Sequence, residues 1–139
     1  GRPGPLVVIV VLAFPAHAAD HWCGQPREHP LDAAYARAME QSGGVTVAMH
    51  DAQTMAFDAW DAELNRLYRG AVRQFGRDAR ADTLRAAQRA WLAWDAAETR
   101  SDLAQQADGG SIGPVTVSNL AMQRRRARAC MLFNMQDEP

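Results

Sequence analysis

Apolar side chains recur every three or four residues along much of this chain, which is the spacing of one face of an α-helix. The longest such pattern covers residues 46–75, and Gly76 follows it as a helix stop. Its apolar positions are Met49, Ala52, Ala56, Trp60, Leu64, Leu67, Ala71 and Phe75. The pattern predicts one long helix with a continuous buried face.

Three further helices follow from the same reasoning. A short one is expected over residues 32–41, and a long one over 78–107 with Asp78 or Asp82 as its N-cap. The last helix is expected over 115–136, after a break rich in glycine and proline. The expected inner positions of the two later helices are Leu84, Ala87, Trp91, Trp94, Val117, Leu120, Met131, Leu132 and Met135.

Strand signals are nearly absent, because β-branched residues alternate only briefly at residues 45–47 and 115–117. We therefore predict an all-α fold: a small antiparallel helical bundle or hairpin of about three main helices, with a short extra N-terminal helix. Two long helices would run antiparallel and a third would cross them. Residues 20–30 contain two prolines and no periodicity, and they are predicted to form an extended arm.

The first residues have the features of an export signal. An apolar run over residues 6–14 precedes Ala16-His17-Ala18, a small-residue pattern that signal peptidases accept. The run is too short to span a bilayer. We expect a signal peptide at 1–18, an arm and short helix at 19–45, and a helical domain at 46–136. The mature protein is expected to be periplasmic or secreted and not membrane-embedded.

Charge is balanced overall but unevenly distributed. The 139 residues carry a formal charge of −1, and every basic residue other than histidine is arginine. This balance does not predict a nucleic-acid partner. Residues 19–65 hold two arginines and eight acids, whereas residues 66–139 hold twelve arginines and eight acids. The asymmetry fits either attraction of a charged partner or internal pairing between helices, and the arginine-rich segment 124–128 fits both.

Nothing in the sequence supports catalysis or a cofactor. Residues 109–113 fit the G-x-S-x-G pattern, but a polar, helix-like segment precedes them and no histidine follows His50. His21, His29 and His50 lack the spacing of metal ligands. We therefore predict no enzyme activity, no metal and no cofactor.

Three short motifs resemble a known family when they are taken in order. They are D-x-x-L-N-x-x-Y at Asp61, Leu64, Asn65 and Tyr68, then Q-R-x-W at Gln88, Arg89 and Trp91, then Gly109-Gly110-Ser111. This order is similar to that of the LprI-like lysozyme-inhibitor family over roughly residues 49–130. The resemblance implies a small, disulfide-supported helical domain outside the cytoplasm. The motif residues fit one of two roles. They could form a buried polar cluster across the helix pair, which is a structural role, or they could contact a partner directly.

The chain departs from that family pattern at its cysteines. Asp95 stands where the pattern has Arg and Thr99 where it has Cys, while Ser118, Asn119 and Leu120 offer no partner cysteine. Ala52 replaces a further one. Only Cys23 and Cys130 remain, and we predict that they pair. The alternative is a buried Cys130 with a free Cys23.

The remaining function is protein binding. By resemblance, the chain would inhibit a lysozyme by covering its cleft, using either the loop at 109–114 or an acidic face that includes Asp51, Asp58, Asp61 and Glu63. The residues proposed for contact are Asp58, Asp61, Gly109, Gly110 and Ser111. The alternative is a non-inhibitory envelope accessory or immunity-type interaction protein. The sequence does not predict an oligomeric state.

Overall fold

The computed structural model describes residues 1–11 and 21–139 of the chain. Across these residues it contains helices and no strand, which confirms the predicted fold class. The elements are the 3-10 helix η1 (Trp22–Gly24) and the α-helices α1 (Pro30–Gln41), α2 (Thr46–Phe75), α3 (Ala79–Gln105) and α4 (Ile112–Asn134). Residues 1–11 are exposed and have no regular secondary structure. The predicted cleavage motif lies outside the described residues, so the signal peptide stays a prediction.

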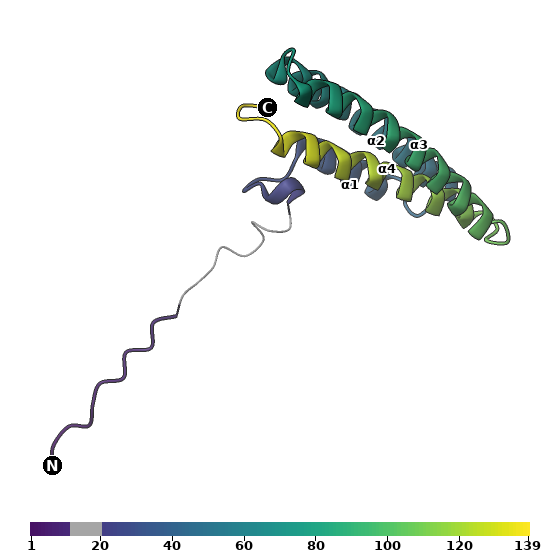
Figure 1. Cartoon of the computed structure of the whole chain (residues 1–139). Helices are drawn as coiled ribbons and strands as arrows, with labels where there is room; N and C mark the ends of the chain where they lie inside the picture. Colours follow the sequence, from purple (N-terminus) through teal and green to yellow (C-terminus); the bar gives the residue numbers. More distant parts are fainter. Residues whose placement is uncertain (12–20) are drawn as a thin grey trace.

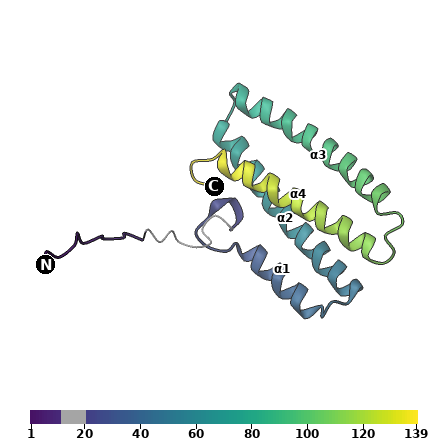
Figure 2. The same cartoon turned by 90° about the horizontal axis from the view of Figure 1, so that it is seen from below.

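The four α-helices alternate in direction along one axis (Figure 1). As a result α2 and α4 run parallel and lie side by side, as Figures 1 and 2 both show. Asp61 of α2 is bonded to Arg125 of α4, and further along both helices the carbonyl of Leu67 accepts from Gln136. The third long helix therefore lies alongside α2. This corrects the prediction that a third helix would cross an antiparallel pair.

Local signals place the helix ends close to their predicted positions. Asp78 is the N-cap of α3, where its carboxylate accepts from the backbone N–H of Arg80 at 2.7 Å. Gly76 ends α2 with a φ of 65°, a conformation that favours glycine. α1 begins earlier than predicted because His29 caps it and Pro30 occupies the first turn. α4 begins at Ile112, directly after Ser111.

The core confirms the predicted stripe on α2 and corrects those on α3 and α4. All stripe positions on α2 are buried except Met49 and Phe75, which are half-buried. On α3, Leu84 is buried and Trp91 half-buried, but Ala87 and Trp94 are exposed.

The inner positions predicted on α4 need more correction. Leu132 is buried and Val117 half-buried, but the other three predicted side chains are exposed: Leu120, Met131 and Met135. The buried side chains of α3 and α4 are instead Ala81, Leu84, Gln88, Asp95, Val115, Met122, Arg128, Ala129 and Leu132. The prediction failed because it counted apolar residues only, whereas three of these buried side chains are polar.

The predicted extended arm is folded against the bundle. Trp22 in η1 is only 4% exposed, and its ring lies 5.5 Å from that of Trp60 and 5.1 Å from that of Phe133. Its indole N–H donates to the carbonyl of Arg126. Cys23 lies at disulfide distance from Cys130, as predicted, with their Cα atoms 5.3 Å apart. The arm is thus fixed to α2 and α4.

Candidate interaction surface

Three arginines of the arginine-rich segment of α4 form internal ion pairs. Arg124 bonds to Asp95 at 2.6 Å, to Asp102 at 2.8 Å and to Thr99 at 2.9 Å, all on α3. Burial lowers the pKa of Arg124, but its hydrogen bonds to the two carboxylates outweigh this, so the pKa lies above its ordinary value. The guanidinium therefore stays charged inside the α3–α4 interface.

The next two arginines of the segment bind other helices. Arg125 joins Asp61 of α2 to Asp95 of α3, at 2.9 and 2.7 Å. Arg126 forms a two-bond pair with Asp32 of α1. Internal pairing therefore accounts for this part of the charge asymmetry.

Arg128 is buried in the same segment without a carboxylate partner in the described part of the chain. Its Nε donates to Oε1 of Gln88 at 3.0 Å, and its Nη2 has no hydrogen-bond partner there. Burial lowers its pKa below the ordinary value. Within the described residues, the Arg128 guanidinium thus contacts the amide of Gln88 and the sulfur of Met131, and no carboxylate balances its charge.

The predicted acidic face is partly neutralised by these pairs. Asp61 bonds to Arg125 and Asn65, and Glu63 pairs with Arg66. Asp51 and Asp58 are exposed and form no ion pair with the rest of the described chain. Only these two members of the face remain available to a partner.

The family-motif residues mostly lie in the helix interfaces. Leu64 is buried, and Tyr68 and Trp91 pack partly buried against the core. Two polar members bond to α4 through arginine, Asp61 through Arg125 and Gln88 through Arg128, while Asn65 donates to Asp61 within α2. Arg89 is exposed. These contacts give the motif a role in packing α2 and α3 on α4.

The loop between α3 and α4 has a tightly fixed backbone. Its Gly109 N–H donates to the carbonyl of Gln106 at 2.9 Å, and Gly110 has a φ of 61°. A Cβ at Gly113 would lie 3.0 Å from the same carbonyl, so a side chain there would force a shift. Ser111 is exposed at the N-cap of α4, and its side chain makes no capping bond.

A groove of about 350 Å³ lies beside this loop. Its lining is His50, Leu103, Gln106, Ala107, Gly110, Gly113, Pro114, Val117 and Ser118. The α1–α2 turn lies at the same end of the bundle (Figure 2). Exposed aliphatic side chains gather on these segments: Val45, Val47, Leu103 and Ile112 are each at least half exposed. We call this region, residues 42–50 and 103–118, the loop end. Asp58 and Asp61 lie about 12 and 16 Å further along α2 than His50.

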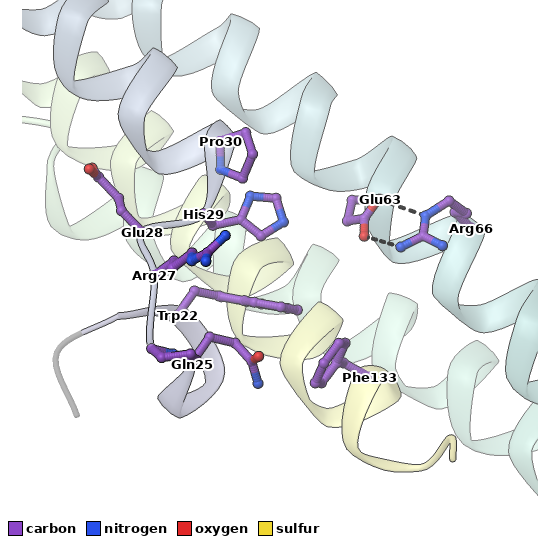
Figure 3. A pocket seen from close by; sticks show the side chains of 10 residues that line it. Trp22, Gln25, Arg27, Glu28, His29, Pro30, Glu63, Arg66 and Phe133 are labelled. Carbon is purple, nitrogen blue, oxygen red and sulfur yellow. Dashed lines mark hydrogen bonds and ion pairs between the residues drawn. The ribbon is translucent and has the colours of Figure 1, made fainter. Parts of the chain in front are cut away.

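A second groove, of about 420 Å³, lies between the arm and the bundle (Figure 3). Figure 3 shows Trp22 and His29 on the arm side, Phe133 of α4 at one end, and the paired Glu63 and Arg66 on α2. The hydrogen bond from Arg66 lowers the pKa of Glu63. This arm groove was not predicted, because it joins residues that are far apart in sequence and share no spacing.

Two other site types are not seen in residues 1–11 and 21–139. No group of three or more histidine, cysteine or acidic side chains is placed there to hold a metal ion. No helix in these two ranges is long and apolar enough to cross a membrane.

Comparison with known proteins identifies a family whose matched range includes one of the two grooves and little of the other. The sequence pattern described as "Lysozyme inhibitor LprI" matches residues 36–132. The chain belongs to the LprI family. No curated protein and no solved structure matches the chain. The lining of the loop-end groove falls inside the matched range, whereas the arm groove is lined mainly by residues 22–30 and Phe133, outside it.

Proposed function

We propose that this LprI protein is exported, binds a lysozyme and inhibits it by covering the catalytic cleft with the loop end. The family match over residues 36–132 carries the proposal. Proteins of the LprI family are exported, and a paired Cys23 and Cys130 are consistent with an oxidising compartment. The apolar run before Ala16-His17-Ala18 supports a periplasmic or secreted location.

The shape of the loop end supports its role as the contact surface. The hydrogen bond from the Gly109 N–H to the Gln106 carbonyl restrains the loop backbone, so the loop loses less conformational freedom on binding, which lowers the cost of association. The exposed aliphatic side chains beside the groove supply apolar area that a partner would bury. A projecting, rigid loop fits a concave enzyme cleft better than the flat side of a helix does.

Charge also favours this end over the rest of the molecule. The exposed acids of this half include Glu40, Asp51, Asp58 and Asp108, against the exposed Arg37 and Arg100. A cationic muramidase would be attracted to such a surface, and opposite charge raises the rate of encounter. Asp51 and Asp58 would contribute by this long-range attraction.

A bulky substitution at the loop tip tests the proposal. We expect Ser111→Trp to raise the concentration needed for half-inhibition by roughly tenfold or more, because the indole would hold the loop out of the cleft. The measurement is lysozyme activity on cell walls with the oxidised chain present. Ala86→Trp is the matched control, since it adds the same side chain to an exposed position on α3 away from the loop.

Two outcomes would contradict the proposal at different levels. Equal inhibition by both variants would place the contact surface elsewhere. Full activity of several lysozyme types at micromolar excess of the chain would reject inhibition itself. The chain would then be an accessory or immunity-type protein, and capture of a different exported partner would be the next test.

A further inference from the structure

The end of the bundle opposite the loop carries arginines that the fold does not neutralise. Arg69 and Arg73 lie one turn apart on α2, and Arg85 and Arg89 lie one turn apart on α3. All four are exposed. Only Arg85 has an ion pair within the described chain, to Asp82, whose side chain is 79% exposed. We call these four residues the arginine cluster.

Three arginines of the cluster line a shallow groove between α2 and α3. Its volume is about 290 Å³, and it is lined by Tyr68, Arg69, Val72, Arg73 and Arg85, with no carboxylate among them. The acids of the nearby turn are engaged elsewhere, since Asp78 pairs with Arg80. The bond to Asp78 raises the pKa of Arg80, and the negative charge of Asp137 in the C-terminal tail raises it further. The groove therefore presents positive charge without a balancing acid in its wall.

This arrangement is unfavourable for the isolated helices. Like charges four residues apart on a helix repel each other, and the cluster contains two such pairs. The arginines of α4 show the contrast, because Arg124, Arg125 and Arg126 each reach a carboxylate of another helix. Uncompensated repulsion at one end of the bundle is explained if an external anion completes the site.

We propose that the arginine cluster binds the phosphate groups of anionic lipids at a membrane surface. A planar guanidinium donates two parallel hydrogen bonds to phosphate. The chain contains arginine and no lysine, so every basic side chain other than histidine has this geometry. The four groups are spread over two neighbouring helices along an open groove, which suits an array of headgroups better than one enclosed phosphate. Only Tyr68 offers an aromatic ring there, and it is half-buried, so bases of nucleic acid find no stacking surface.

The proposed contact would also orient the molecule, because α2 and α3 carry the cluster at one end and the loop at the other (Figure 2). With the cluster on a membrane, the loop end would face away from it. The inference stands independently of lysozyme binding, since it depends only on the cluster.

Sedimentation with lipid vesicles tests the inference. The full chain is mixed with vesicles of phosphatidylcholine alone or with phosphatidylglycerol, and we expect tighter binding to the anionic vesicles that weakens as salt is raised. Each arginine near such a surface contributes roughly a fivefold gain, so Arg69→Gln with Arg73→Gln should weaken binding about 25-fold. The exposed apolar residues 6–11 are shared by every variant, so differences between variants report the arginines.

The matched control is Arg37→Gln with Arg100→Gln, which removes the same charge from exposed positions in the other half. It should bind within about threefold of the unmodified chain if its residues lie beyond the screening length. No loss in the cluster variant, or an equal loss in the control, would overturn the proposal. Soluble polyphosphate is the last probe. Binding to polyphosphate that depends on the cluster, without binding to vesicles, would overturn the lipid assignment.

Discussion

His29 shows how a single side chain fixes the start of α1. Its Nδ1 accepts from the backbone N–H of Leu31 at 3.0 Å, so this nitrogen must be unprotonated. The ring lies 4.6 Å from that of Trp60. Burial lowers the pKa of His29 and is opposed by Glu63 and Asp32, while Arg126 and Arg66 lower it further. The folded protein thus favours the neutral imidazole.

This geometry predicts a pH-dependent part of the stability. Because the pKa of His29 is lower in the folded than in the unfolded chain, the unfolded state takes up a proton first as pH falls. The stabilisation is complete above about pH 6.5, the ordinary pKa of histidine, and is lost as pH falls toward the folded value. Free energies of unfolding at pH 7.5 and 5.0 should therefore differ more for the unmodified chain than for His29→Asn. Asparagine can still cap α1 but does not titrate.

The control for this prediction is His50→Asn, which removes a histidine that lies within α2 and not at the N-cap of a helix. It should retain the full pH dependence. If His29→Asn behaves like His50→Asn, the imidazole of His29 does not couple protonation to folding.

At the scale of elements, the α3–α4 interface is held by polar bonds that converge on Arg124. Asp95, Thr99 and Asp102 of α3 all bond to this guanidinium. The interface therefore depends on charge as well as on apolar packing.

Removing Asp95 tests how strongly this connection holds α3. The side chain is 8% exposed and bonds to both Arg124 and Arg125. We expect Asp95→Ala to lower the free energy of unfolding by roughly 3–5 kcal/mol, because two largely buried guanidinium groups lose a shared partner. Asp82→Ala removes an exposed pair instead and should cost about 1 kcal/mol or less. Urea denaturation of oxidised protein measures both, and similar losses would mean that Asp95 adds little to the interface.

The same elements show how far the sequence alone could lead. The bounds of α2 follow from an uninterrupted apolar stripe and a glycine stop, and both are present in the structure. The buried faces of α3 and α4 could not be derived this way, because Gln88, Asp95 and Arg128 are buried only by virtue of partners on other helices. The loop was predictable from its glycines. The arm groove and the arginine cluster were not, since each combines residues from separate segments.

At the scale of the whole molecule, one sulfur link ties the arm to the end of α4. Cys23 and Cys130 are 107 residues apart in sequence, so the link closes a long loop in the unfolded chain. Cys23→Ser with Cys130→Ser should lower the free energy of unfolding by about 2–5 kcal/mol. Thiol reduction of the unmodified protein should give the same loss in denaturant unfolding. Unchanged stability after either treatment would show that the link does not restrict the unfolded chain.

Trp22 should keep part of the arm in place after that loss. Its ring remains packed on Trp60 and Phe133, and its N–H remains bonded to Arg126. The helices and the loop end are therefore expected to survive reduction at neutral pH.

The two flanks of α4 are fastened by different chemistry, and this has a practical consequence. A reducing agent would open the disulfide of the arm without touching α3, whereas strong acid would discharge the carboxylates that dock α3, and also Asp32 on the arm side, and leave the sulfur atoms joined. The redox state of the medium thus acts on one flank of this small bundle alone, whereas its acidity acts on both.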